Sequence, residues 1–153
     1  MTGMYFEEFD VGQTFKSAGR TLTEADLTMF SMLSGDWHPI HADVEFCKSS
    51  RYGARLIHGA LGIAVATGMM HEIGIFKDTA VAMLSLRDWQ FSKPIFVNDT
   101  LHLEIEIIAT DGDRSPRVGS VDRTLRMINQ KSETVQEGQS AVLIAKRNEL
   151  EPA

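Results

Sequence analysis

The sequence lacks the features that mark secreted and membrane-spanning proteins. Cys47 is the only cysteine among 153 residues, so no internal disulfide can form, and we interpret it as a small apolar filler on a helix. The longest apolar stretch, residues 60–70, is well short of the roughly 20 residues that a membrane-spanning helix needs. Residues 1–9 carry acids and lack the basic-then-apolar order of a signal peptide. We therefore expect a cytoplasmic protein with no membrane partner.

Positive charge is also scarce. The chain has 15 Lys and Arg residues against 21 Asp and Glu residues, which gives a formal net charge of -6 and a pI of about 5.3. It has no basic run and no alternation of basic with aromatic residues, so nucleic acid is not expected as a partner. Arg51, Arg55 and Lys93 have the charge to meet a phosphate-bearing ligand, but solvated surface positions are the simpler interpretation.

The composition that remains is that of an ordinary globular domain, with 43% apolar and 24% charged residues. A length of 153 residues suits one domain and is enough to bury a sizeable core. No internal repeat, low-complexity tract or linker divides the chain, and residues 149–153 form a loose tail. We therefore treat residues 1–153 as a single domain.

The first half of the chain predicts one strand and three helices. Thr23 and Asp26 have the form of a helix N-terminal cap, and Gly35 ends the helix that follows. The most apolar helix is apolar on nearly all sides, so we expect it to be buried. The predicted elements are a strand at residues 14–21 and helices at 23–35, at 44–49 behind an Asp43 cap, and from 56–59 to about 70 or 73.

The second half predicts four long strands in succession. Residues 101–107 alternate apolar and polar side chains, which is typical of a strand with one buried face, whereas residues 80–91 are largely apolar, as expected for a central strand. Separate helices and consecutive strands predict an α+β fold, with an antiparallel sheet around the long helix. Its open edges and open face favour a homodimer. The remaining strands are 118–128 and 135–146, with a possible bulge at Gly138.

A bend after the first helix carries the residues that point to a function. Gly35 precedes Asp36 and Pro39 precedes His41, which argues for a stiffened turn and against a continuous helix. Such a turn can direct a carboxylate and an imidazole, five positions apart in sequence, at one small volume. An acid and an imidazole that converge can orient and deprotonate a water molecule.

Each candidate residue also has a simpler interpretation. Asp36 alone would be a turn residue bonded to its own backbone, and His41 alone a packed surface histidine, but their pairing on one turn favours a function. For His58 we prefer a buried ring bonded to backbone over contact with a substrate. For Gly59, helix packing and a functional role for its amide are equally good interpretations. His71 and His102 look exposed, and neither has a second ligand at helical or strand spacing, so no metal is expected.

The bend is followed by a second pattern, Gly53-x-Arg55-Leu56-Ile57-His58-Gly59, in which a His-Gly pair opens an apolar helix. With Ser34-Gly35-Asp36-Trp37-His38-Pro39-Ile40-His41, it resembles the signature of the MaoC-like, or R-specific enoyl-CoA hydratase, family. The resemblance covers essentially the whole chain, because it continues upstream through Tyr5-Phe6-Glu7-Glu8-Phe9-x-Val11-Gly12 and Thr21-x-Thr23-Glu24-Ala25-Asp26.

This resemblance implies a hot-dog fold, in which an antiparallel sheet wraps a long central helix, and a dimer with active sites near the subunit interface. It implies hydration of trans-2-enoyl thioesters of coenzyme A, or the reverse dehydration, with coenzyme A as part of the substrate and no other cofactor. Asp36 and His41 would be the catalytic pair, and the Gly59 amide the oxyanion donor. The family usually has asparagine where this chain has His38, which bears on loop geometry and substrate range.

Two other functions fit the same sequence. An acyl-CoA thioesterase on this scaffold would direct water at the thioester carbonyl instead of at C3. A non-catalytic acyl-CoA-binding subunit of a larger assembly would bind the thioester without turning it over. The sequence fixes neither the acyl chain length and its substitution nor the metabolic pathway.

Overall fold

The computed structural model of the chain describes residues 3–147, so the tail predicted at 149–153 lies outside it. An antiparallel sheet and one long helix form its body, and three shorter helices precede the long one. In chain order the elements are η1 (Phe6–Glu8), β1 (Thr14–Lys16), β2 (Arg20–Thr21), α1 (Glu24–Ser34), α2 (Pro39–Ala42), α3 (Val44–Lys48), α4 (Gly59–Ile73), β3 (Ala80–Phe91), β4 (Thr100–Asp111), β5 (Val118–Ile128) and β6 (Thr134–Ala145).

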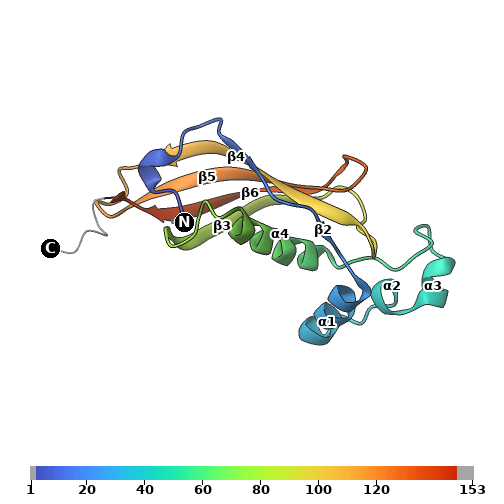
Figure 1. Cartoon of the computed structure of the whole chain (residues 1–153). Helices are drawn as coiled ribbons and strands as arrows, with labels where there is room; N and C mark the ends of the chain where they lie inside the picture. The colour runs from blue at the N-terminus through green and yellow to red at the C-terminus, as the bar shows by residue number, and fades with distance from the viewer. Residues whose placement is uncertain (1–2, 148–153) are drawn as a thin grey trace.

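The strands follow the order β1-β4-β5-β6-β3, with β2 also paired to β4, and every pairing is antiparallel. The long helix α4 lies along one face of the sheet, and α1, α2 and α3 gather beyond one end of it (Figure 1). The predicted α+β class and the antiparallel sheet around a central helix are therefore confirmed. No helix within residues 3–147 has both the length and the apolar character needed to cross a membrane.

The core lies between α4 and the inner face of the sheet. Along β4 the apolar residues Leu101, Leu103, Ile105 and Ile107 are fully buried, and the polar residues between them are half-exposed. Full burial of each such side chain contributes about 1.5–3 kcal/mol. This burial pattern confirms the alternation predicted for the strand. The prediction was possible because a period of two is visible in the sequence itself.

The strand β3 is not the central strand that its apolar sequence predicted. It lies at one edge of the sheet, where β6 is its only partner within residues 3–147, and most of its side chains are exposed. An apolar run indicates that a strand avoids water, but it does not indicate which neighbour covers it. The large apolar residues exposed on β3 are Val81, Met83, Leu84, Leu86 and Phe91.

The helix α4 is covered on one side only, which corrects the prediction of a helix buried all round. Ala60, Ala64, Thr67 and Gly68 are exposed, and their spacing of three and four residues places them on one face. The small side chains on this face made the helix look apolar on nearly all sides in the sequence. In the structure, nothing within residues 3–147 covers this face. The residues on the opposite, buried face are Leu61, Gly62, Val65, Ala66, Met69 and Met70.

The strand predicted at residues 14–21 is interrupted between β1 and β2. Ser17 lies in the gap, where its N–H donates to the carbonyl of Leu103 and its hydroxyl accepts from the N–H of Leu103, both at 2.9 Å. The side chain therefore replaces a backbone group of the ladder and breaks the strand in two. Phe15, in the middle of β1, is half-buried.

The bulge predicted at Gly138 lies on the opposite strand. The register between β3 and β6 shifts between Arg87 and Gln90, whereas Gly138 itself pairs regularly with Leu125. A Cβ at Gly138 would lie 2.4 Å from the Trp89 ring, so the glycine makes room for the bulged strand.

We expect two copies of the chain to associate through the open edge of β3 and the exposed face of α4. The edge offers unpaired backbone groups beside exposed apolar side chains, and a second copy would cover both. Sedimentation velocity should give twice the chain mass of 17.0 kDa. Leu84→Lys should shift the protein toward the monomer, and Val11→Lys, at an exposed apolar residue outside β3, should not. A monomeric wild-type chain at micromolar concentration would contradict this expectation.

Candidate active site

The bend after α1 has the backbone that its glycine and proline predict. Gly35 ends α1 in the left-handed conformation, with φ of 75°. Pro39 begins α2, a single helical turn in which its missing N–H is not needed. His38 caps this turn, because its Nδ1 accepts a hydrogen bond from the N–H of Ile40 at 3.2 Å. A histidine ring thus supplies the acceptor that an asparagine side chain offers at such a position.

The carboxylate of Asp36 and the imidazole of His41 face each other. Oδ2 of Asp36 lies 3.8 Å from Nε2 of His41, too far for a direct hydrogen bond but short enough for both atoms to hold one water molecule. Nδ1 of His41 lies 2.7 Å from the carbonyl oxygen of Leu56. Because a carbonyl can only accept, Nδ1 carries the proton, and Nε2 presents its lone pair on the side of Asp36.

Burial keeps His41 in its neutral form. Desolvation is the largest influence, and it lowers the pKa of the imidazole below its ordinary value of 6.5. The hydrogen bond to Leu56 and the charge of Asp36 act in the opposite direction, whereas the rings of His58 and His38 lower the pKa further. The His41 side chain is 14% exposed and that of Asp36 is 50% exposed, so solvent water can reach the space between them.

His58 supports both members of the pair, which the sequence did not reveal. Its ring stacks on that of His41, with centroids 3.8 Å apart and planes 21° from parallel. Its Nε2 donates to the backbone carbonyl of Asp36 at 3.0 Å. The predicted buried ring bonded to backbone is confirmed, and the same ring also positions Asp36 and His41. No spacing rule connects these three positions, so only the fold shows the contact.

Asp36, His41 and His58 bring one carboxylate oxygen and two ring nitrogens within 4.8 Å of one another. Their geometry does not suit a metal ion. Nε2 of His58 is already a donor to the carbonyl of Asp36, so it has no lone pair to offer a metal ion. The three side chains fit acid–base chemistry better, and the absence of a metal stays a prediction.

The amide of Gly59 is open at the start of α4. As the first residue of the helix it has no acceptor one turn earlier, and no hydrogen bond within residues 3–147 supplies another. The helix dipole adds partial positive charge at this end. A Cβ at Gly59 would lie 2.7 Å from the ring of Phe91, so packing also requires the glycine. Both interpretations of Gly59 thus have physical support.

Gln136, on β6, holds the first turn of α4 in place. Its Nε2 donates to the carbonyl of Gly59 at 3.1 Å, and its Oε1 accepts from Nε1 of Trp89 at 3.2 Å. A Cβ at Gly62 would lie only 2.3 Å from the Gln136 amide, which explains the second glycine of this helix. The sequence gives no signal for this role, because a glutamine within a strand is typical of a solvent-facing position.

His41 and Gly59 line one cavity of about 540 Å³, a volume that suits a small-molecule ligand. Arg51 and Lys93 also line it, and each is held by a neighbour: Arg51 by the hydroxyl of Tyr52, and Lys93 by Glu133 at 2.6 Å. The other walls are Leu56, Ile57, Phe91, Ser92, Pro94, Ile95 and Gln136. Asp36 does not line this cavity, and its Oδ2 meets Nε2 of His41, which does.

The sequence matches the model of the MaoC-like domain over residues 8–131. The chain belongs to the MaoC-like domain family. It is 33% identical over 101 residues to protein MaoC of Klebsiella aerogenes, covering 66% of this chain and only 30% of that relative. It is 27% identical over 111 residues to an (R)-specific enoyl-CoA hydratase of Aeromonas caviae, covering 72% of this chain and 80% of the relative.

Two solved structures have the same fold. The X-ray structure of a monoamine oxidase regulatory protein from Archaeoglobus fulgidus superposes with a TM-score of 0.87 at 30% identity, over 95% of this chain and 97% of that one. A Mycobacterium tuberculosis protein described as a double hotdog fold gives a TM-score of 0.84 at 21% identity, over 99% of this chain and 47% of that one. The predicted hot-dog fold is therefore confirmed.

The contact between Gly62 and Gln136 predicts a strong coupling between these two positions. Gly62→Ala places a methyl group against the Gln136 amide, so we expect it to lower the free energy of unfolding by ~1–3 kcal/mol. In a Gln136→Ala background the space is free, and the same change should cost much less. Urea denaturation of the four proteins of this cycle measures the coupling. An equal cost of Gly62→Ala in both backgrounds would contradict the contact.

Proposed function

We propose that the protein adds water to trans-2-enoyl thioesters of coenzyme A to give 3-hydroxyacyl thioesters, or catalyses the reverse dehydration. The observation that carries this proposal is the 3.8 Å approach of Asp36 Oδ2 to His41 Nε2, beside a cavity that Gly59 also lines. Membership of the MaoC-like domain family supports it, as does the similarity to a relative named an (R)-specific enoyl-CoA hydratase.

In the proposed mechanism, Asp36 and His41 hold one water molecule against C3 of the enoyl group. Nε2 of His41 accepts a proton from this water while the water oxygen bonds to C3, and the carboxylate of Asp36 accepts the other hydrogen bond. The lowered pKa of His41 serves this step, because the ring must be neutral at working pH. The proton then passes from Nε2 to C2, so that the hydroxyl group at C3 and the proton at C2 are added to the same face of the double bond.

The Gly59 amide acts on the other end of the reacting group. As water adds at C3, negative charge moves to the thioester oxygen, and an amide donor at a helix start stabilises it. One such donor is typically worth about 10²–10³ in rate. Glycine also lets the thioester approach this amide closely, because it has no side chain in the way.

The coenzyme would extend past the cavity mouth. Arg51 and Lys93 line the same cavity as His41, and their charges can meet the phosphates of coenzyme A. Their present contacts, with a tyrosine hydroxyl and with a glutamate, are open to solvent and can be exchanged for contacts with a phosphate. An active dimer is part of the same proposal, because the open edge of β3 ends at Phe91, beside Gly59.

Loss of either member of the pair should remove most of the hydration activity. Asp36→Asn leaves an amide that holds water differently, and His41→Ala removes the base, so we expect turnover to fall about 10²–10⁴-fold for each. The measurement is loss of enoyl absorbance with a trans-2-enoyl-CoA, alongside melting temperatures that show intact folds. Asp113→Asn and His102→Gln, outside the site, are the matched controls. Unchanged turnover in either site variant would reject the assignment.

The same assay separates the two other functions. Release of free thiol with the double bond intact would identify a thioesterase and reject the hydratase. If neither reaction occurs while coenzyme A thioesters still raise the melting temperature, the chain is a non-catalytic acyl-CoA-binding subunit.

A further inference from the structure

Arg123 is a cation on the apolar face of β5. Alternate residues of a strand share a face, and Arg123 stands in the row of Val121, Leu125 and Met127. All four side chains are buried, and Arg123 is only 3% exposed. Arginine is almost never buried to this extent without a partner, so this position calls for a specific counter-ion.

Within residues 3–147 the Arg123 guanidinium has only weak partners. One terminal nitrogen lies 3.4 Å from the hydroxyl of Ser140, the central carbon lies 4.5 Å from the ring centroid of Phe76, and Nε has no partner. Burial lowers the pKa of Arg123 to about 10, so the side chain is still charged at neutral pH. Arg126 on the same strand is bonded to two glutamates, at 2.9 and 2.6 Å. Arg123 has no equivalent of these carboxylates.

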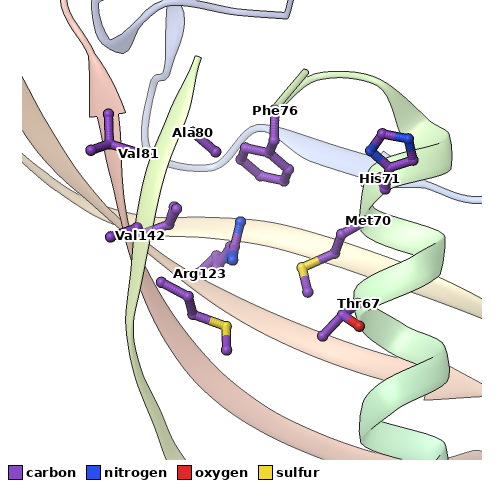
Figure 2. Close-up of a pocket in the computed structure, with 10 residues that line it drawn as sticks. Thr67, Met70, His71, Phe76, Ala80, Val81, Arg123 and Val142 are labelled. Atoms are coloured by element: carbon purple, nitrogen blue, oxygen red, sulfur yellow. The ribbon is translucent and has the colours of Figure 1, made fainter. Parts of the chain in front are cut away.

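The guanidinium of Arg123 lines a cavity of about 400 Å³ between α4 and β3. Figure 2 shows the side chain between Phe76, Met70 and the strand that carries Val142. No acidic residue within residues 3–147 lines this cavity, and its walls are mostly apolar. The cavity therefore combines a buried positive charge with apolar surface, which is the environment that a fatty or branched carboxylic acid requires.

We propose that this cavity binds a carboxylate at the end of a short apolar chain, with Arg123 as its counter-ion and Met70, Phe76 and Met83 against the chain. The planar guanidinium fork matches a carboxylate. A single buried cation balances one negative charge, so it suits a monoanion such as a carboxylate better than a dianion such as phosphate. Arg123 is thus a specificity-determining residue for a carboxylate ligand.

Two sources could supply this carboxylate: a free short-chain acid, or the far end of an acyl group on coenzyme A. The second source rests on the proposed function. Within one chain, Gly59 and this cavity lie toward opposite ends of α4. If two β3 edges pair antiparallel about a twofold axis, the Phe91 end of one copy lies beside the Ala80 end of the other. The Gly59 amide of one copy would then stand near the Arg123 cavity of its partner.

The first experiment measures melting temperature with sodium butyrate, against sodium chloride and sodium phosphate at equal ionic strength. We expect butyrate to stabilise the wild-type protein and Arg126→Met, and to leave Arg123→Met unaffected. The Arg123→Met protein should fold, because replacing an unpaired buried charge by an apolar side chain of similar size is often neutral or stabilising. In calorimetry, butyrate should bind Arg123→Met at least about tenfold more weakly than the wild type.

The second experiment compares kcat/KM for trans-2-hexenedioyl-CoA and trans-2-hexenoyl-CoA, which differ only in a terminal carboxylate. If the acyl group is the source, Arg123→Met should lower the ratio of the first to the second at least about tenfold and spare the second. If a free acid is the source, only the butyrate effect should depend on Arg123. Should neither thioester be turned over, the proposed function fails, and the butyrate experiment alone decides.

The proposal is overturned if Arg123→Met changes neither the response to butyrate nor the kinetic ratio. It is also overturned if Arg123→Met only converts a dimer to monomers in sedimentation, because the counter-ion would then be an acidic side chain of the second copy.

Discussion

The hydrogen bond from Nδ1 of His41 to the carbonyl of Leu56, 2.7 Å long, is the interaction on which the site depends. Leu56 in turn donates its N–H to the carbonyl of Ile40 at 3.0 Å, so two hydrogen bonds join α2 to the segment before α4. Ile57 is bonded to the carbonyl of Ile95, which ties this segment to the sheet at 2.8 Å. The imidazole therefore has one tautomer and one orientation before any substrate binds, as preorganised catalysis requires.

The four residues from Leu56 to Gly59 organise the whole site. Leu56 accepts from His41, His58 stacks on the same ring and bonds to the carbonyl of Asp36, and Gly59 offers its amide at the start of α4. One short segment thus positions the base, the acid and the amide together. A shift of this segment would displace all three groups at once, which explains why Gln136 and Phe91 pack so tightly against its end.

Local patterns were enough to predict much of the fold and the bend, because caps, alternation and proline act over a few residues. Contacts between residues far apart in the chain could not be predicted from these patterns. The sequence did not show that β3 is an edge strand, because apolar character does not indicate which element packs against a strand. It did not connect His58 or Gln136 with the residues that they hold. Arg123 did carry a signal, a charge at an inward position of a regular alternation, and the structure shows its burial.

The central claim is that His41 is a neutral base with its free nitrogen toward Asp36. Nitrogen NMR of the imidazoles, with His41 assigned by its loss in His41→Ala, tests this most directly. The account predicts a ring that is neutral at neutral pH, protonated at Nδ1 and unprotonated at Nε2, with a pKa below the ordinary 6.5. A ring that is charged at neutral pH, or that carries its single proton on Nε2, would contradict it, because no lone pair would then face the water.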